Sequence, residues 1–334
     1  MSDVSAIQAL RTSAESGVAK MKERFSIGEF GWIWIATAAL FGISAVVAPG
    51  TVRFASIVAM LPFAAMLAIV AIGQTIVIQQ RGLDLSSAGL MSLGGILVAQ
   101  FGFSTGSIFL AVALTLIVCA ACGAVNGLLI ARLNIMPIVA TLATNALLLG
   151  AIQTLSGGSP MTVPKALEVF SHERLFGVPY TLFLSLLFVA LAALVSTRTL
   201  IGRRFIAVGA NPRGARAAGI GVLRYQVGTY AAAALCFAVA GILYAGFIGS
   251  ASQAAGNDYL LPGIAAVVVG GTPFTGGRGS VVASGVAAIF MTQLGIMVLA
   301  LGAGTAVQLL VQAGVIILAT TIRHVPGFLR TLLR

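Results

Sequence analysis

Few side chains in this sequence have the types and spacing that catalysis requires. The 334 residues include eight acidic residues and two histidines, and no HExxH, GxSxG or carboxylate pair occurs among them. The lysines, Lys20, Lys22 and Lys165, each lack the preceding glycine of an ATP-binding P-loop. Cys119 and Cys122 form a CxxC pair inside an apolar segment, which favours packing over redox or metal chemistry. We therefore expect no catalytic residue, metal site or cofactor in this chain.

Polar side chains inside apolar segments are the other candidates for chemistry, because they could contact a transported solute. They are Gln74, Asp84, Asn126, Asn145 and Asp258. An ionisable group at the centre of a membrane costs about 2.5–3.5 kcal/mol on insertion scales, so the two aspartates need a reason to be there. One possibility is that each aspartate caps the helix that follows it, with Asp84 also forming an ion pair with Arg81. The other is that each lines a solute path through a broken helix. The amides either bond to neighbouring helices or contact solute.

The composition indicates that a membrane surrounds these residues. Hydrophobic residues make up 59% of the chain and charged residues 8%, and the mean hydropathy is +1.07. In a soluble domain about a quarter of the residues are charged, so this chain has too few charged residues to cover a water-facing surface. The 40 glycines allow helices to approach closely in lipid. We expect an all-α fold, a polytopic membrane bundle of helices.

Hydropathy and length predict about ten crossings. Their approximate limits are 31–49, 54–79, 86–103, 107–131, 135–155, 179–197, 225–248, 259–271, 280–301 and 304–322. With the N-terminus in the cytoplasm, all basic residues fall inside except Arg53, Lys165 and Arg174. This bias places both termini in the cytoplasm. It also explains the net charge of +11 without nucleic acid as a partner.

Three regions divide the chain. In residues 1–28, apolar residues recur at helical spacing from Val4 to Phe25, which favours an amphipathic helix on the membrane lipid or on a partner rather than a cleaved signal peptide. Residues 29–324 form the membrane domain, and residues 325–334 form a cytoplasmic tail. Within the domain, residues 198–224, called the coupling segment below, carry several arginines and no acidic residue. This segment either anchors the topology alone or contacts a partner.

A short internal similarity suggests a repeat. Gly-Leu-Asp at residues 82–84 and Gly-Asn-Asp at residues 256–258 each precede an apolar run that ends near a glycine pair. Five predicted crossings separate the two, and an odd number inverts the second half relative to the first. Inverted repeats of five helices are one way to build a transporter. So short a match also arises by chance.

Four blocks in order resemble the ribose-type ABC transporter permease family. Gln-Gln-Arg-Gly-Leu-Asp-Leu-Ser at residues 79–86 is similar to its Gly-Ile-Asp-Leu-Ser signature, and Asn-Gly-Leu-Leu at 126–129 with Pro-Ile-Val-Ala-Thr-Leu at 137–142 to its next block. Residues 202–212 with 215–220 resemble the cytoplasmic loop that meets the ATPase, and residues 264–272 with 276–279 its glycine block. The sequence departs from the pattern at Arg81, where the family usually has glycine.

The resemblance implies the permease subunit of an ATP-driven importer for a sugar or sugar-like solute in the bacterial inner membrane. It implies two permease copies, two ATP-binding subunits that bind ATP-Mg, and a periplasmic solute-binding protein. It also implies a coupling helix at about residues 211–219 that docks on the ATPase, with Pro212 in its first turn. The residues expected to couple are Gly209, Ala210, Asn211, Pro212, Arg213, Ala215, Arg216, Ala217 and Gly219.

Other functions remain open at this point. The broader family also includes permeases for nucleosides and for branched-chain amino acids. An ion-coupled secondary transporter would need intramembrane carboxylates, for which Asp84 and Asp258 could serve. A membrane enzyme that acts on lipid is disfavoured by the missing catalytic cluster.

Overall fold

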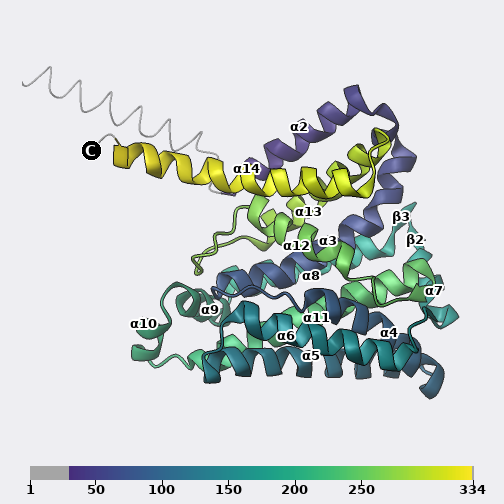
Figure 1. Ribbon diagram of the computed structural model, residues 1–334, viewed down its shortest axis with the longest axis horizontal. Helices are drawn as coiled ribbons and strands as arrows, with labels where there is room; N and C mark the ends of the chain where they lie inside the picture. The colour runs from purple at the N-terminus through teal and green to yellow at the C-terminus, as the bar shows by residue number, and fades with distance from the viewer. Residues whose placement is uncertain (1–29, 333–334) are drawn as a thin grey trace, which may run out of the picture.

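The structure is a computed structural model that describes residues 30–332, with side chains for residues 30–321 (Figure 1). Within these residues lie 13 α-helices, one 3₁₀ helix and two pairs of two-residue strands. The helices are α2 (Trp32–Val47), α3 (Phe54–Gln79), α4 (Ser87–Thr105), α5 (Ile108–Leu133), α6 (Pro137–Ser156), α7 (Lys165–His172), α8 (Tyr180–Arg198), α9 (Leu200–Ala210), α10 (Pro212–Ala217), α11 (Val222–Ile248), α12 (Asn257–Val269), α13 (Val281–Ala300), α14 (Thr305–Leu332) and the 3₁₀ helix η1 (Pro49–Val52). The strands are β1 (Met161–Thr162), β2 (Arg174–Leu175), β3 (Val178–Pro179) and β4 (Ser250–Ala251).

The predicted all-α membrane bundle is confirmed, and each predicted crossing coincides with a helix. Among the described helices, seven are long and apolar enough to cross a membrane, namely α3, α4, α5, α6, α8, α11 and α13. Three shorter apolar helices occupy the other predicted positions, namely α2, α12 and the Thr305–Thr321 part of α14. The chain is therefore a multi-pass membrane protein by length and composition, and the total of ten crossings stays a prediction.

Glycines set the central contacts of the bundle. Helix α11 lies at the centre and packs against α3, α4 and α5. On α5, an ideal Cβ at Gly123 would lie 2.4 Å from the Tyr230 carbonyl oxygen, and one at Gly127 would lie 2.6 Å from Val227 Cα. On α11, a Cβ at Gly241 would lie 1.8 Å from the Met91 carbonyl oxygen of α4. Only glycine permits backbones this close, and close backbone contact is what holds helices together in lipid.

Helix contacts in the two halves follow the same pattern. The contact of α3 with α13 corresponds to the contact of α11 with α5. The contact of α4 with α11 corresponds to that of α12 with α3. Likewise α4 contacts α6 as α12 contacts α14. Helices α2 and α8 break this correspondence, because both pack against α13. Exchange of the second to fifth predicted crossings (α3, α4, α5 and α6) with the seventh to tenth (α11, α12, α13 and α14) is the arrangement that a five-helix repeat would produce.

The connections gather at two ends of the bundle. Helices α9 and α10 lie at the same end as the end of α14, and α7 with β2 and β3 lies at the opposite end (Figure 1). Strand β1 pairs antiparallel with β4, and β2 with β3. The connection between the predicted crossings 135–155 and 179–197 contains α7, whose Leu167 and Ser171 are buried. A Cβ at Gly246 of α11 would lie 2.3 Å from Ser171 Oγ, so α7 rests directly on α11.

Two predicted regions stay untested. The amphipathic helix expected in residues 1–28 lies outside the described residues. Helix α14 continues to Leu332, so the described backbone of the predicted tail, residues 325–332, is helical.

Candidate functional site

The coupling segment forms two short helices with well-defined starts. Thr199 accepts a hydrogen bond from the Gly202 N–H through its side chain at 3.1 Å, which caps α9. Asn211 Oδ1 accepts from the Gly214 N–H at 3.0 Å and caps α10, whose first residue is Pro212. A short helix therefore lies where the sequence predicted one. It ends at Ala217, and Gly219 follows with a φ of +77°.

The nine residues expected to couple divide by exposure. Ala210, Asn211, Arg213, Arg216, Ala217 and Gly219 are exposed, and Pro212 is half-buried. Gly209 and Ala215 are buried within the chain. Ala215 packs with Val208 and Val222 in a small apolar cluster beneath α10. A partner could therefore touch α10 and its flanks, whereas Gly209 and Ala215 face the permease itself.

The end of α9 is held against two other segments. One is the end of α3, and the other is the loop of residues 270–280 between α12 and α13. An ideal Cβ at Gly209 would lie 2.1 Å from the Gln79 carbonyl oxygen, and one at Gly277 would lie 2.5 Å from Ala210 Cα. The Gly277 N–H donates to that Gln79 carbonyl at 2.8 Å. The glycine block thus allows three backbones to meet at one place.

Three of the five predicted solute-path residues, Gln74, Asp84 and Asn126, lie around one break between helices. The break is residues 80–86, called the linker below, between α3 and α4. Gln74 Nε2 donates to the Asp84 carbonyl at 2.6 Å and to Ser87 Oγ at 3.0 Å. Asn126 Nδ2 donates to Ser86 Oγ at 3.0 Å, and Thr144 donates to Asn126 Oδ1. These residues, Gln74, Asp84, Ser86, Ser87, Asn126 and Thr144, form the polar cluster.

The polar cluster satisfies backbone groups that the break exposes. Asp84 is fully buried, and its Oδ1 accepts from the Ser86 N–H at 2.8 Å. The Leu85 N–H donates to Thr141 Oγ1 at 3.1 Å. Asn126 lies about two turns, or about 10 Å, before the end of α5 at Leu133, so the break lies inside the bundle. Irregular backbone at such a depth requires polar partners from the protein.

The expected ion pair between Asp84 and Arg81 is wrong. Arg81 Nε donates to the Gly209 carbonyl at 2.8 Å, and a second guanidinium nitrogen donates to the Ala210 carbonyl. Arg81 has a φ of +64°, and its side chain is exposed whereas Asp84 is buried. Residues spaced by three on a helix are neighbours, but here the spacing falls on an irregular turn. The two charged side chains therefore lie in different surroundings.

The remaining predicted residues lie at the edge of this arrangement. Asn145 Oδ1 accepts from the Gly89 N–H at 2.9 Å, so it supports the first turn of α4. Asp258 is exposed in the first turn of α12, outside the polar cluster. The starts of α12 and α4 nonetheless adjoin, since Ser92 Oγ accepts from the Gly256 N–H at 2.9 Å and donates to the Gln253 carbonyl at 2.8 Å.

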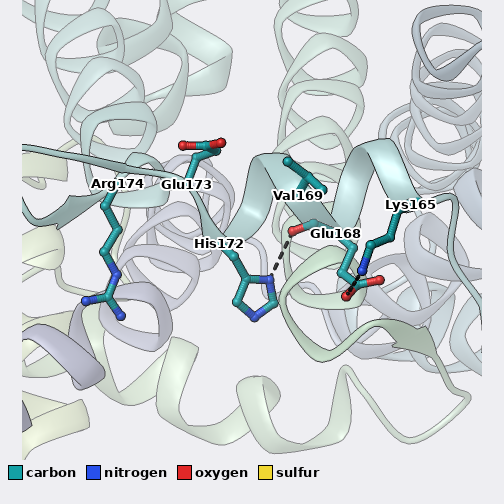
Figure 2. A pocket seen from close by; sticks show the side chains of 6 residues that line it. All are labelled: Lys165, Glu168, Val169, His172, Glu173 and Arg174. Atoms are coloured by element: carbon teal, nitrogen blue, oxygen red, sulfur yellow. Dashed lines mark hydrogen bonds and ion pairs between the residues drawn. The ribbon is translucent and has the colours of Figure 1, made fainter.

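A surface hollow of about 510 Å³ lies on α7, at the end of the bundle opposite α10. Figure 2 shows its lining of Lys165, Glu168, Val169, His172, Glu173 and Arg174. Lys165 pairs with Glu168 at 2.7 Å, and His172 Nδ1 lies 3.0 Å from the Glu168 carbonyl. The hollow is open and lined by charge, and it contains none of the residues predicted for the solute path.

The hydroxyl partners of the polar cluster were not among the predicted site residues. Ser86, Ser87, Thr141 and Thr144 stand in or next to the blocks that carry the family resemblance. Their side chains are small enough to occur freely in membrane helices, so type alone does not distinguish them. Arg81 was noticed as a departure from the pattern, but its contact with α9 spans more than a hundred residues of sequence.

Comparison with known proteins is consistent with these features. Residues 56–320 match a family model described as "Branched-chain amino acid transport system / permease component". The chain is 31% identical over 293 residues to the ribose import permease protein RbsC of Escherichia coli K12, covering 86% of this chain and 91% of that protein. It is 33% identical over 254 residues to RbsC of Bacillus subtilis, covering 75% of this chain and 79% of that protein.

A third relative is named for a different solute. The chain is 35% identical over 233 residues to the autoinducer 2 import system permease protein LsrD of Photorhabdus luminescens, covering 68% of this chain and 70% of that protein. No solved structure matches the chain. In this family a separate ATPase subunit handles ATP, and import also involves a binding protein. The chain therefore belongs to the family of transport-system permease components, the non-catalytic membrane subunits of ABC importers.

Proposed function

We propose that the chain is the channel-forming subunit of an ATP-driven importer for a sugar or sugar-like solute. The observation that carries this proposal is the exposed helix α10, capped at its start and joined through α9 to the ends of membrane helices. Such a helix is suited to receive movement from a separate ATPase that binds ATP-Mg. The relatives, which are import permeases for ribose and for autoinducer 2, favour a hydroxylated solute.

Coupling would proceed from α10 inward. Ala217, Arg213 and Arg216 offer an exposed surface to the ATPase, while Ala215 fixes α10 on the chain below it. Closure of two ATPases around ATP would displace α10 and α9. The buried Gly209 lies against Gln79, so the displacement would reach the end of α3.

The topology belongs to the same proposal. Ten crossings, with both termini in the cytoplasm of a bacterial inner membrane, place α10 on the cytoplasmic side and α7 on the periplasmic side. The exchange of helix contacts between the halves supports inverted five-helix repeats. The outward apolar side chains of α6 and α14, such as Leu147 and Leu310, suit lipid or a second permease copy. A periplasmic binding protein would meet the end that carries α7.

The polar cluster supports a structural role for most of the predicted solute-path residues. Gln74, Asp84 and Asn126 are fully buried, and their bonds go to the linker and its neighbours. We infer that they hold the break between α3 and α4 and set where α4 begins. Asp258, exposed at the start of α12, is the better candidate to face solute.

Reconstitution tests the proposed function. The permease is assembled in proteoliposomes with its ATPase and binding protein, and uptake of radiolabelled ribose is compared with that of leucine. We expect uptake of ribose that requires ATP and the binding protein. Preference for leucine would replace the sugar with a branched-chain amino acid. Uptake that follows an ion gradient and ignores ATP would overturn the proposal.

A further inference from the structure

Arg81 has a backbone conformation that is favourable for glycine and strained for arginine. Its φ of +64° lies in the left-handed region, and it is the second residue after the end of α3 at Gln79. Glycine reaches this region without steric cost, whereas a residue with a side chain does not. A strained arginine at a connection needs a compensating contact, and the contact is present.

The side chain of Arg81 binds the end of α9. Its Nε donates to the Gly209 carbonyl at 2.8 Å, and its second nitrogen donates to the Ala210 carbonyl. These are the last two carbonyls of α9, and the last four carbonyls of a helix have no partner within it. The positive charge also faces the negative end of the helix dipole. The arginine therefore has both the geometry and the charge for this position.

Neighbouring contacts hold the same junction. Gln80 Nε2 donates to the Phe205 carbonyl of α9 at 2.7 Å, and the Gln79 carbonyl accepts from the Gly277 N–H at 2.8 Å. A Cβ at Gly276 would lie 2.3 Å from Arg81 Cγ, so glycine there leaves the space that the arginine occupies. The end of α3 thus contacts α9 through three consecutive residues and contacts the loop of residues 270–280 as well.

We propose that Arg81 is a positioning residue that fastens the coupling segment to α3, so that displacement of α10 moves the linker. This inference rests on the proposed function, and it adds the residue that connects the coupling segment to α3. Residues 82–86 follow Arg81 directly and are held by the polar cluster. A pull on Arg81 therefore acts on the start of α4 without passing through the length of α3.

Three variants separate this role from general stability. Arg81→Gly removes the side chain and relieves the left-handed backbone, so the chain is expected to fold. Arg81→Lys keeps the charge but loses the planar fork that serves two carbonyls. Arg132→Ala is the matched control, because Arg132 is an exposed arginine in the last turn of α5 and its loss removes the same charge.

The first measurement needs neither ATPase nor solute. Spin labels are attached at Ala217→Cys and Met136→Cys after Cys119, Cys122 and Cys236 have been replaced by alanine. The distance distribution between the labels is then recorded by pulsed electron resonance for the purified full chain. We expect it to broaden in Arg81→Gly, to broaden less in Arg81→Lys, and to stay unchanged in Arg132→Ala.

The second measurement uses the assembled transporter. Arg81→Gly should lower the number of solute molecules imported per ATP hydrolysed by about fivefold or more, with the ATPase still bound. Arg81→Lys should restore part of this ratio. An unchanged distance distribution in Arg81→Gly would overturn the inference, and so would an unchanged import ratio. If no ATP-driven import occurs in the unsubstituted chain, the proposed function fails while the distance result still decides whether Arg81 fastens α9.

Discussion

The crossing of α11 over α4 at Gly241 allows a quantitative test of the bundle. An ideal Cβ at this position would lie 1.8 Å from the Met91 carbonyl oxygen and 2.7 Å from its carbonyl carbon. Real Cβ atoms essentially never approach a neighbouring heavy atom within 3.0 Å. Gly241→Ala must therefore move the two backbones apart by about 1.2 Å, the difference between 3.0 and 1.8 Å.

The cost of this movement follows from the contact that resists it. The obstructing atom belongs to the backbone of α4, so no side-chain rotation can relieve the clash. Gly94 of α4 lies against Ala238 of α11 in the same crossing, and separation would also loosen that contact. Overpacking of a tight interior costs about 1–3 kcal/mol, and a rigid backbone contact places Gly241→Ala at the upper end, about 3 kcal/mol.

Gly228 provides a matched control on the same helix. It has no atom within 4 Å of an ideal Cβ, so Gly228→Ala should be neutral or should stabilise the helix by up to about 1 kcal/mol. The assay is reversible unfolding of the purified chain in mixed micelles, followed by helix content. Equal unfolding free energies for the two variants would refute the close approach of α11 and α4.

Further substitutions test individual contacts. Asn211→Ala removes the cap of α10 and should destabilise that helix by about 1 kcal/mol, which faster hydrogen exchange at the Gly214 amide would report. Ala217→Glu introduces a charge on the exposed face of α10, and we expect loss of ATPase binding in a pull-down with membrane insertion intact. Gly209→Asp should instead disturb the permease itself, because its Cβ would lie 2.1 Å from the Gln79 carbonyl, and lower thermal stability in detergent would show this. Asn126→Leu should leave Ser86 and Thr144 without their amide partner and destabilise the fold by about 1–3 kcal/mol, as unfolding in mixed micelles would measure.

Hydropathy predicted the helices well because the membrane is a simple constraint. A crossing needs about 20 apolar residues, and the observed helices begin and end within a few residues of the predicted limits, except that α14 continues to Leu332, well past its predicted end at residue 322. The start of α10 was also predictable, because Asn211 and Pro212 form a local signal for a helix start that needs no distant partner.

Contacts between distant segments could not be predicted in this way. Hydropathy does not show that Asn126 meets Ser86, or that Arg81 binds α9 instead of its near neighbour Asp84. Helix α7 was not predicted, because a helix of eight residues with a single buried stripe resembles a polar loop in sequence. Its stability comes from packing on α11, which the sequence does not show. In each case the deciding information lies in the tertiary packing.

The small strand pair at the end opposite α10 affects how the bundle can deform. Met161 pairs with Ala251 and Thr162 with Ser250, which ties the chain after α6 to the chain after α11. A tilt between these two helices would therefore have its pivot near the strand pair, and the displacement would increase along the helices toward the far end. A thrust at α10 would open or close the bundle most at its own end, while the tied end stayed nearly stationary.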